Sequence, residues 1–338
     1  MRQSRKGSHM NVAYVSNENY ARHLAVSLCS LCDSNADAEE LNIYVISTGI
    51  GERSKEKIRR TADAFGRTVE FRDFWNLGAR FERCPDTGSF DISTMGRLFL
   101  GELLPETAER VLYLDCDTVV LKPLARLWDT KLAGCVLAAV QEPTIYPEVK
   151  RYLHMEAEEP YFNAGVLLID LKRWREERIT EQLLSYYSAI EEESLFNDQD
   201  ALNGCLAGRI RSVAPKWNFF TNYRYFRYDT LCRMQPSYRV HSRESFAFAR
   251  RKPSIVHFAG DERPWKAGAL NHYGKAYEAY LEMTPFAGTE KERGSEWKLL
   301  MYHGMDLITP VLPGLRARIG HHYVTKLIRE RSARRRER

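Results

Sequence analysis

Residues 110–120 read Arg-Val-Leu-Tyr-Leu-Asp-Cys-Asp-Thr-Val-Val, an apolar run interrupted by two carboxylates. The apolar residues predict a buried β-strand, and Asp115 and Asp117 stand where that strand ends. At a spacing of i, i+2, both side chains can reach one hard cation such as Mg²⁺ or Mn²⁺. The same spacing is also typical of an ordinary turn, and it recurs at Asp198 and Asp200. The run therefore predicts a strand. Whether Asp115 and Asp117 bind a cation or only form a turn depends on the residues around them.

The sequence on both sides of this strand alternates between β-rich and helical stretches. Such alternation indicates an α/β fold with a mostly parallel central sheet. Ligands of such sheets bind outside the carboxyl ends of the strands, which singles out residues 15–20 and 115–118. We predict strands at 12–15, 42–47, 69–74, 110–115, 135–140 and 254–258, an apolar run at 162–169, and helices at 20–32, 52–65, 94–104, 171–190, 198–207, 297–305 and 315–331.

The composition is that of a globular protein with a basic end. Of 338 residues, 44 % are hydrophobic and 28 % charged, which excludes a disordered or fibrous chain. Residues 315–338 hold nine Lys/Arg and two Glu, a net +7, so the first 314 residues carry −2 of the total +5. A body so close to neutrality argues against nucleic acid as a partner.

The cysteines and the chain ends suggest a reduced, cytoplasmic protein. Seven cysteines occur without a regular framework, and the pair Cys29 and Cys32 falls in an apolar helical run, where cysteine is usually a small buried residue. The sequence contains no apolar stretch of membrane-spanning length. Because Gly7-Ser-His-Met10 resembles a cloning remnant, we assign residues 1–9 to a tag, 10–283 to the main domain and 284–338 to a small helical, basic C-terminal extension.

Six motifs occur in a set order, and together they resemble glycosyltransferase family 8, which contains bacterial lipopolysaccharide galactosyl- and glucosyltransferases and the glycogenins. The similarity extends from about residue 11 to about residue 281 and is greatest to the lipooligosaccharide galactosyltransferases. The motifs are Asn17-Glu-Asn-Tyr20, Ser93-Thr-Met-Gly-Arg97, Leu112-Tyr-Leu-Asp-Cys-Asp117, Tyr161-Phe-Asn-Ala-Gly-Val-Leu-Leu168, Asp198-Gln-Asp-Ala-Leu-Asn203 and His257-Phe-Ala-Gly-Asp-Glu-Arg-Pro-Trp265.

The resemblance implies a Rossmann-like, GT-A nucleotide-sugar-binding domain and a metal-dependent enzyme. Asp115, Asp117 and His257 would bind Mn²⁺ (or Mg²⁺) together with the diphosphate of a UDP-hexose. The remaining donor-binding residues implied in this way are Asn17, Asn19 and Tyr20 for uridine, Arg97, Cys116, Gly260 and Arg263 for the diphosphate side or the donor sugar, and Asn163, Ala164, Gly165, Asp198 and Gln199 for the transferred sugar.

The resemblance also implies transfer with retention of anomeric configuration. Gln199 would lie near the anomeric carbon, but an amide is a poor nucleophile, and Asp198 is not clearly placed as one. We therefore expect front-face attack, in which the departing UDP oxygen takes the acceptor's proton. Gln141 stands where the galactosyltransferases have an Asp that touches the sugar, so galactose and glucose both remain open.

Two other functions fit part of the sequence. An apolar strand followed by Asp-x-Asp-Thr also resembles the nucleophile motif of haloacid-dehalogenase-type phosphatases. That motif usually opens its domain, however, and here about a hundred residues of α/β pattern precede it. The second alternative is a glycogenin-like protein that glucosylates itself as a primer; the eighteen tyrosines permit this, but no feature marks a priming residue.

Two regions are candidates for contact with the acceptor. Residues 216–228 interleave aromatic side chains with Arg224 and Arg227, a composition that suits either a sugar-stacking surface or a partly buried hydrophobic segment. Residues 315–331 alternate apolar and basic positions and read either as a basic amphipathic helix on an anionic membrane surface or as a solvated tail. A lipid-linked glycan acceptor would suit a peripheral protein on the cytoplasmic face of the membrane.

Overall fold

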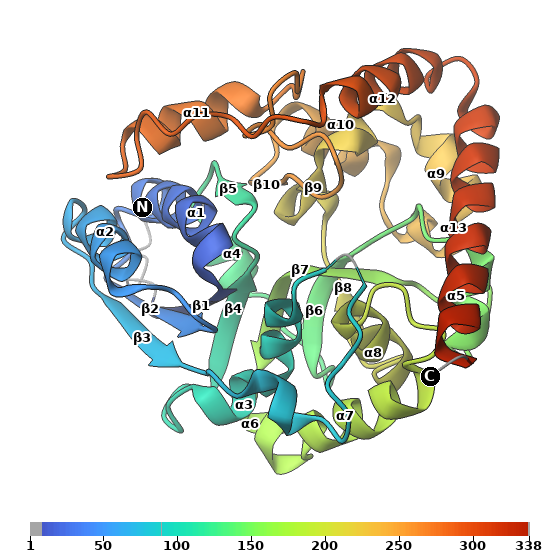
Figure 1. Cartoon of the computed structure of the whole chain (residues 1–338). Coiled ribbons are helices and arrows are strands. Elements are labelled where there is room, and N and C mark those ends of the chain that lie inside the picture. The colour runs from blue at the N-terminus through green and yellow to red at the C-terminus, as the bar shows by residue number, and fades with distance from the viewer. Residues whose placement is uncertain (1–8, 89, 337–338) are drawn as a thin grey trace, which may run out of the picture.

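The computed structural model describes residues 9–88 and 90–336, with the side chains of 331–336 left aside (Figure 1). Most of the predicted tag, residues 1–8, lies outside the described residues, and His9 already begins the first strand. The predicted boundary between the main domain and the C-terminal extension stays a prediction.

A seven-stranded sheet runs through the molecule in the order β3-β2-β1-β4-β7-β6-β8. Each neighbouring pair is parallel except β4–β7 and β6–β7, so β7 alone runs against the others of this sheet. The predicted mostly parallel sheet is confirmed. Its strands are β1 (His9–Ser16), β2 (Glu40–Ser47), β3 (Val69–Asp73), β4 (Arg110–Leu114), β6 (Leu137–Gln141), β7 (Phe162–Asp170) and β8 (Ile210–Ser212).

The side chains of this sheet pack into two hydrophobic cores, one on each face, because successive residues of a strand point in opposite directions. Val111 and Tyr113 of β4 belong to one hydrophobic cluster, and Leu112 and Leu114 belong to the other. Successive strand residues point to opposite faces, so a run that is apolar throughout requires cover on both sides. The helices α1 (Ala21–Ser34) and α2 (Glu52–Asp63) cover one face, and the helical segments between β3 and β4 and after β7 cover the other (Figure 1).

The helices of the second face differ from those predicted. Residues 94–104 form mostly a 3₁₀ segment, η3 (Ile92–Phe99), before α3 (Leu100–Leu103). The single helix predicted over 171–190 is wrong: it is broken into α6 (Leu171–Glu176) and α7 (Ile179–Ile190) because Arg178 adopts φ +52°, a left-handed conformation that a helix cannot contain. The other helical segments are η1 (Glu18–Tyr20), η2 (Leu77–Arg80), α4 (Ala125–Trp128), α5 (Pro147–Tyr152), α8 (Asp198–Cys205), η4 (Pro215–Trp217), η5 (Thr221–Tyr225), α9 (Tyr228–Met234), η6 (Pro236–Val240), α10 (Arg243–Arg251) and α11 (Gly274–Glu282).

A second, three-stranded sheet connects distant parts of the sequence. It has the order β5-β10-β9, with β5 (Thr118–Val120) antiparallel to β10 (Ile255–His257) and β10 parallel to β9 (Phe219–Phe220). Since β5 follows the Asp115–Asp117 turn directly and its Thr118 pairs with His257, the sheet brings His257 beside the aspartates.

The C-terminal residues form α12 (Glu296–Ile308) and α13 (Pro313–Arg336), which curve around the edge of the molecule (Figure 1). Val324 of α13 is buried in a main core cluster, and His321 lies 2.8 Å from Glu148 at the start of α5. Among the described residues, none of the helices combines the length and apolarity needed to cross a bilayer.

Candidate active site

The Asp115–Asp117 turn is held between the two sheets. The Asp115 N–H donates to the Gly165 carbonyl of β7 (2.8 Å), and the Thr118 hydroxyl donates to the Asp115 carbonyl (2.8 Å). Phe258, just after β10, donates its N–H to the Asp117 carbonyl (2.9 Å). The backbone on both sides of the turn is therefore anchored, which fixes the directions of both carboxylates.

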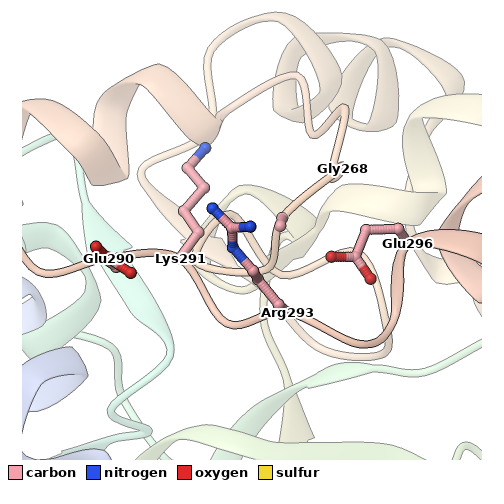
Figure 2. A pocket seen from close by; sticks show the side chains of 6 residues that line it. Gly268, Glu290, Lys291, Arg293 and Glu296 are labelled. Atoms are coloured by element: carbon pink, nitrogen blue, oxygen red, sulfur yellow. The ribbon is translucent and has the colours of Figure 1, made fainter.

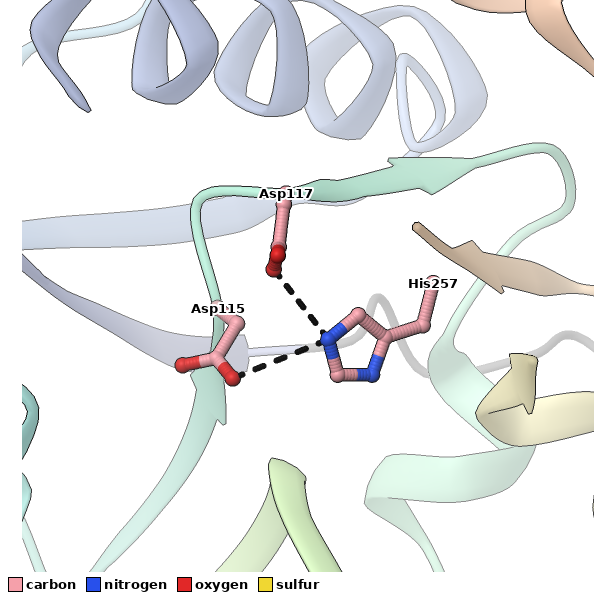
Figure 3. A group of neighbouring side chains, drawn as sticks. All are labelled: Asp115, Asp117 and His257. Carbon is pink, nitrogen blue, oxygen red and sulfur yellow. Dashed lines mark ion pairs between the residues drawn. The ribbon is translucent and has the colours of Figure 1, made fainter. Parts of the chain in front are cut away.

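Asp115, Asp117 and His257 converge, as the family resemblance implies for a metal site (Figure 3). His257 Nε2 lies 3.1 Å from Asp117 Oδ1 and 3.8 Å from Asp115 Oδ2, and the three ligand atoms lie within 4.8 Å of one another. His257 is buried and Asp115 is half-buried. Two carboxylate oxygens and one imidazole nitrogen form a donor set that fits a divalent cation.

The orientation of His257 is set by Asn218, which the sequence analysis did not single out. Asn218 Nδ2 donates to Asn163 Oδ1 (2.9 Å), so its Oδ1 faces His257 Nδ1 (2.9 Å) as an acceptor. Nδ1 must then carry the proton, and the Nε2 lone pair points at the carboxylates. A hydrogen bond to the second ring nitrogen is the usual means of orienting a metal-binding histidine, so the histidine fits the role of a metal ligand.

The ionisable side chains of this site shift one another's pKa values. Burial raises the pKa of Asp117, but the neighbouring His257 and Arg263 outweigh it and hold that pKa below its usual value. Burial likewise opposes a charged His257, yet the Asp117 carboxylate, with Asp115 behind it, raises the pKa of His257. The group therefore attracts positive charge, which a cation can supply as well as a proton.

Gly165 lies directly against this group. A Cβ at this position would stand 2.3 Å from His257 Cε1 and 2.9 Å from Asp115 Oδ2. Only glycine allows the β7 backbone to approach two of the candidate metal ligands so closely. This contact gives a physical reason for a glycine in the Asn163-Ala-Gly165 motif.

Arg97 links the metal site to the predicted sugar site. Its guanidinium contacts Asp115 Oδ1 (3.0 Å) and Asp198 Oδ2 (2.9 Å), and it donates to the Ala164 carbonyl (2.6 Å). Arg97 is thus a buried ion-pair bridge, and its predicted contact with the donor stays a prediction. Burial raises the pKa of Asp198 to about 6, despite the opposing charge of Arg97.

Both the oxygen and the nitrogen of the Gln199 side-chain amide form hydrogen bonds with protein groups. Its Oε1 accepts from Asn163 Nδ2 (2.9 Å) and from the Ala164 N–H (3.0 Å), and its Nε2 donates to Glu142 Oε2 (3.1 Å) and Tyr161 OH (3.2 Å). The second Asp-x-Asp carboxylate, Asp200, is buried among hydroxyl and N–H donors and is structural. The predicted sugar-binding residues therefore form one hydrogen-bonded group.

Glu142, and not Gln141, belongs to the hydrogen-bonded group around Gln199. Gln141 is buried against Ser212 (3.2 Å) and Ser237 (3.1 Å), whereas Glu142 accepts from both Gln199 and Asn163. A register irregularity between Ala139 and Gln141 disturbs the alternation of β6. Gln141 thus makes its hydrogen bonds outside the Gln199 group, whereas Glu142, which the sequence analysis did not single out, belongs to it, and the choice between galactose and glucose stays open.

At the end of β1, Tyr20 and Arg263 meet. Arg263 donates to the Tyr20 hydroxyl and lies 3.8 Å from Asp117 Oδ2, so it adjoins the metal site. Asn17 caps η1 by accepting the Tyr20 N–H (3.1 Å). Asn19 is exposed beside them. Gly260, before Arg263, has φ +94°, a conformation that favours glycine.

The Cys116 side chain and most aromatic side chains of residues 216–228 are buried, which leaves them little surface for contact with a ligand. The Cys116 side chain is buried and its Sγ contacts the Val15 carbonyl (3.3 Å), so only its backbone remains for the donor. In residues 216–228, five aromatic side chains are buried, and most of them form a hydrophobic cluster of their own. Of the two readings of that segment, the buried one is confirmed; the five are Trp217, Phe219, Phe220, Tyr223 and Phe226.

A separate surface pocket is lined by residues 267–268 and by the stretch from Glu290 to Glu296 that leads into α12 (Figure 2). Its charged side chains are two acidic and two basic, Glu290, Glu296, Lys291 and Arg293, and none of the predicted site residues lines it. With its charges balanced and no link to the aspartates, this pocket contributes nothing to the assignment of the active site.

Comparisons with known proteins identify the family and the fold. The family model described as glycosyl transferase family 8 matches residues 11–269. The chain is 30 % identical over 284 residues to general stress protein A of Bacillus subtilis, covering 83 % of this chain and 96 % of that protein. It is 28 % identical over 280 residues to lipopolysaccharide 1,2-glucosyltransferase of Escherichia coli, covering 82 % and 79 %. A crystal structure of the galactosyltransferase LgtC with donor and acceptor sugar analogues matches with a TM-score of 0.69 at 26 % identity, covering 86 % of this chain and 99 % of that one.

Proposed function

The chain belongs to glycosyltransferase family 8, and on that basis we propose that it moves a hexose, galactose or glucose, from a UDP-sugar to a glycan or glycolipid acceptor with retention of configuration. It is a glycosyltransferase of the GT-A fold, so the phosphatase alternative is wrong. The identity of the donor, the identity of the metal and the retention of configuration are what we propose beyond the family and the fold.

The observation that carries the proposal is the convergence of Asp115, Asp117 and His257, with the Nε2 lone pair of His257 turned toward the carboxylates by Asn218. This donor set would hold Mn²⁺, or Mg²⁺ in its place. When bound, the cation would neutralise charge on the diphosphate of the departing UDP. Arg263 adds a fixed positive charge beside Asp117, which also favours departure of a diphosphate.

The uridine would lie at the end of β1, where Asn17, Asn19 and Tyr20 adjoin Arg263. The Tyr20 ring offers a stacking face for uracil. The Asn17 amide offers both donor and acceptor groups. Because Arg263 contacts Tyr20 and also adjoins Asp117, nucleoside and diphosphate would share one continuous site.

The sugar would lie near Gln199, Asn163 and Asp198. All four hydrogen bonds of the Gln199 amide go to protein groups, so this amide is not free to act as a nucleophile, and Asp198 Oδ2 is paired with Arg97 Nε, which lowers the nucleophilicity of that carboxylate. This arrangement supports front-face transfer, in which the leaving UDP oxygen takes the acceptor's proton and the protein positions both substrates. Glu142 adds a carboxylate that can accept hydrogen bonds from sugar hydroxyls.

The deciding experiment is UDP release from a panel of UDP-sugars with Mn²⁺, in the intact protein and in Asp117→Ala. We expect slow hydrolysis of one donor, lost in the variant and on addition of EDTA. The anomeric configuration of the transferred product, read by NMR, tests retention. Intact mass tests the self-glucosylating alternative, since a primer would gain hexose units without any added acceptor. Equal hydrolysis with and without EDTA would overturn the metal assignment.

We further propose that α12 and α13 place the enzyme on the cytoplasmic face of an anionic membrane. Trp297, Leu300 and Met301 of α12 and Ile319 and Tyr323 of α13 are exposed large apolar side chains. Exposed basic residues accompany them on α13, namely Arg318, Lys326 and Arg329. Apolar side chains flanked by cations suit a surface of anionic headgroups.

Co-sedimentation with vesicles of anionic or neutral lipid tests this placement. We expect binding to anionic vesicles only, weakening as salt rises, and strongly reduced in Ile319→Glu/Tyr323→Glu. Leu270→Glu is the matched control, because Leu270 is 71 % exposed but lies outside both helices. Equal binding by the double variant and the wild type would contradict the proposal.

A further inference from the structure

A second group of potential metal ligands joins the Arg263 loop to α12. Glu262, the residue before Arg263, faces His303 and Asp306 of α12. These two are spaced i, i+3 and so share one face of the helix. His303 Nδ1 lies 2.8 Å from Glu262 Oε1, and one ligand atom from each residue falls within 4.8 Å of the other two. The geometry resembles that of the aspartate–histidine site, but it is built from a different part of the fold.

The two carboxylates of this group are buried and incompletely paired. Glu262 is 8 % exposed and Asp306 is 3 % exposed. Arg316 of α13 contacts Asp306 Oδ1, but within the described part of the chain Glu262 Oε1 and Asp306 Oδ2 have no hydrogen-bond donor. A buried, unpaired carboxylate oxygen is costly. With one arginine against two carboxylates, the group is short of one positive charge.

The histidine is oriented to accept a cation. His303 Nε2 lies 3.0 Å from the Gly268 carbonyl and 3.3 Å from the Leu270 nitrogen, and the shorter contact favours an Nε2–H that donates to Gly268. The Nδ1 lone pair then faces Glu262 Oε1, an arrangement that is repulsive unless a cation or a proton lies between them. Burial and the facing Asp306 carboxylate raise the pKa of Glu262 to about 8, the expected response of a carboxyl group in this setting.

We propose that Glu262 Oε1, Asp306 Oδ2 and His303 Nδ1 bind a divalent cation of the Zn²⁺ class, with water as the fourth ligand, at a site distinct from the catalytic one. One imidazole and two carboxylates are ligands that Zn²⁺ accepts in a four-coordinate site, whereas Ca²⁺ requires six to eight oxygens. The bound ion ties α12 to the loop that carries Arg263. The C-terminal helices are thereby coupled to the residue that adjoins Asp117 and Tyr20.

The test is the stoichiometry of Zn²⁺ binding to the full-length, chelator-stripped protein, measured by calorimetry and by metal analysis after desalting. We expect two equivalents in the wild type, one in Asp117→Ala/His257→Ala and one in His303→Ala. Asp306→Asn should also retain one, and this nearly isosteric change protects the test against a folding defect in His303→Ala. His322→Ala, an exposed histidine of α13, is the matched control and should retain two.

Two further readouts distinguish this site from Zn²⁺ binding elsewhere on the protein. Zn²⁺ should raise the melting temperature of Asp117→Ala/His257→Ala but not of the same protein carrying His303→Ala. Co²⁺ in place of Zn²⁺ should show no thiolate charge-transfer band, which excludes the cysteines as ligands. The proposal is overturned if Asp117→Ala/His257→Ala binds no Zn²⁺ at micromolar concentrations, or if His303→Ala and Asp306→Asn bind as much as the control. Either result leaves the catalytic proposal untouched.

Discussion

Replacing Gly165 with alanine tests whether the β7 backbone shapes the metal site. The added Cβ would stand 2.3 Å from His257 Cε1, and ordinary contact begins at 3.4 Å, so the ring must shift by at least 1.1 Å (3.4 minus 2.3). The ring cannot shift freely, because Asn218 holds Nδ1 at 2.9 Å and Phe220 lies beside it with a ring separation of 5.3 Å.

Metal–ligand distances tolerate a deviation of only about 0.2 Å. We therefore expect Mn²⁺ affinity to fall by about 10- to 100-fold, the range seen when a ligand loses its support. A misplacement of about 1 Å at a reacting centre costs on the order of 100-fold in rate, so UDP release should fall by at least that factor. Mn²⁺ titration followed by the EPR signal of the free ion, together with UDP release at saturating donor, measures both effects.

Overpacking by itself destabilises a fold by about 1–3 kcal/mol, which must be separated from the effect on the site. Gly101→Ala is the matched control, since its Cβ would stand 2.6 Å from Trp174 Cδ1, and the three nearest atoms it would meet all belong to Trp174 and not to a metal ligand. We expect Gly101→Ala to lower the melting temperature without changing Mn²⁺ affinity. If Gly165→Ala binds Mn²⁺ and turns over donor as the wild type does, the reasoning from close approach is refuted.

Asn218→Ala removes the acceptor of His257 Nδ1–H and should weaken Mn²⁺ binding by about 10- to 100-fold, as measured by titration; unchanged affinity would mean that Asn218 does not orient the ring. The pKa of Asp198 is raised from 3.8 to about 6, so this carboxyl is charged mainly above pH 6, and kcat/KM should decline as pH falls through that value, in a profile from pH 5 to 8. Because the folded protein holds this proton more tightly than the unfolded chain, the contribution of Asp198 to stability should decrease as pH rises from about 4 to about 6; a flat rate profile would contradict the assignment. Glu142→Ala leaves one N–H of the Gln199 amide and one of the Asn163 amide without an acceptor, so we expect a loss of about 1–3 kcal/mol in urea unfolding and a lower kcat; wild-type values for both would exclude a positioning role.

Much of the site could be predicted because its residues follow strands. Asp115 and Asp117 come directly after the apolar run of β4, and His257 is the last residue of β10. The strand-end pattern singled out the aspartates, whereas His257 was predicted only from the resemblance to the family, because β10 belongs to the second sheet and runs antiparallel to β5. The motif order then indicated the family, which the comparisons confirmed.

Local patterns could not reveal which neighbours complete the site. Asn218 is 39 residues from His257, and Glu142 is 57 residues from Gln199, so their contacts exist only once the chain has folded. The register of β6 shifts between Ala139 and Gln141, and Gln141 bonds Ser212 and Ser237 while Glu142 bonds Gln199, a difference that the local sequence does not reveal.

Hydrophobic periodicity and strand-end chemistry are local properties, and for that reason the amino-acid sequence was sufficient to predict the α/β architecture and the aspartate pair, while the order of six motifs indicated the family and, through it, His257. Folding in three dimensions was needed to establish the direction of β7, the ring nitrogen that His257 turns toward the carboxylates, the burial of residues 216–228 and the meeting of Glu262 with His303 and Asp306. Each of these depends on contacts between residues distant in sequence, whose geometry is set by the packing of the whole chain.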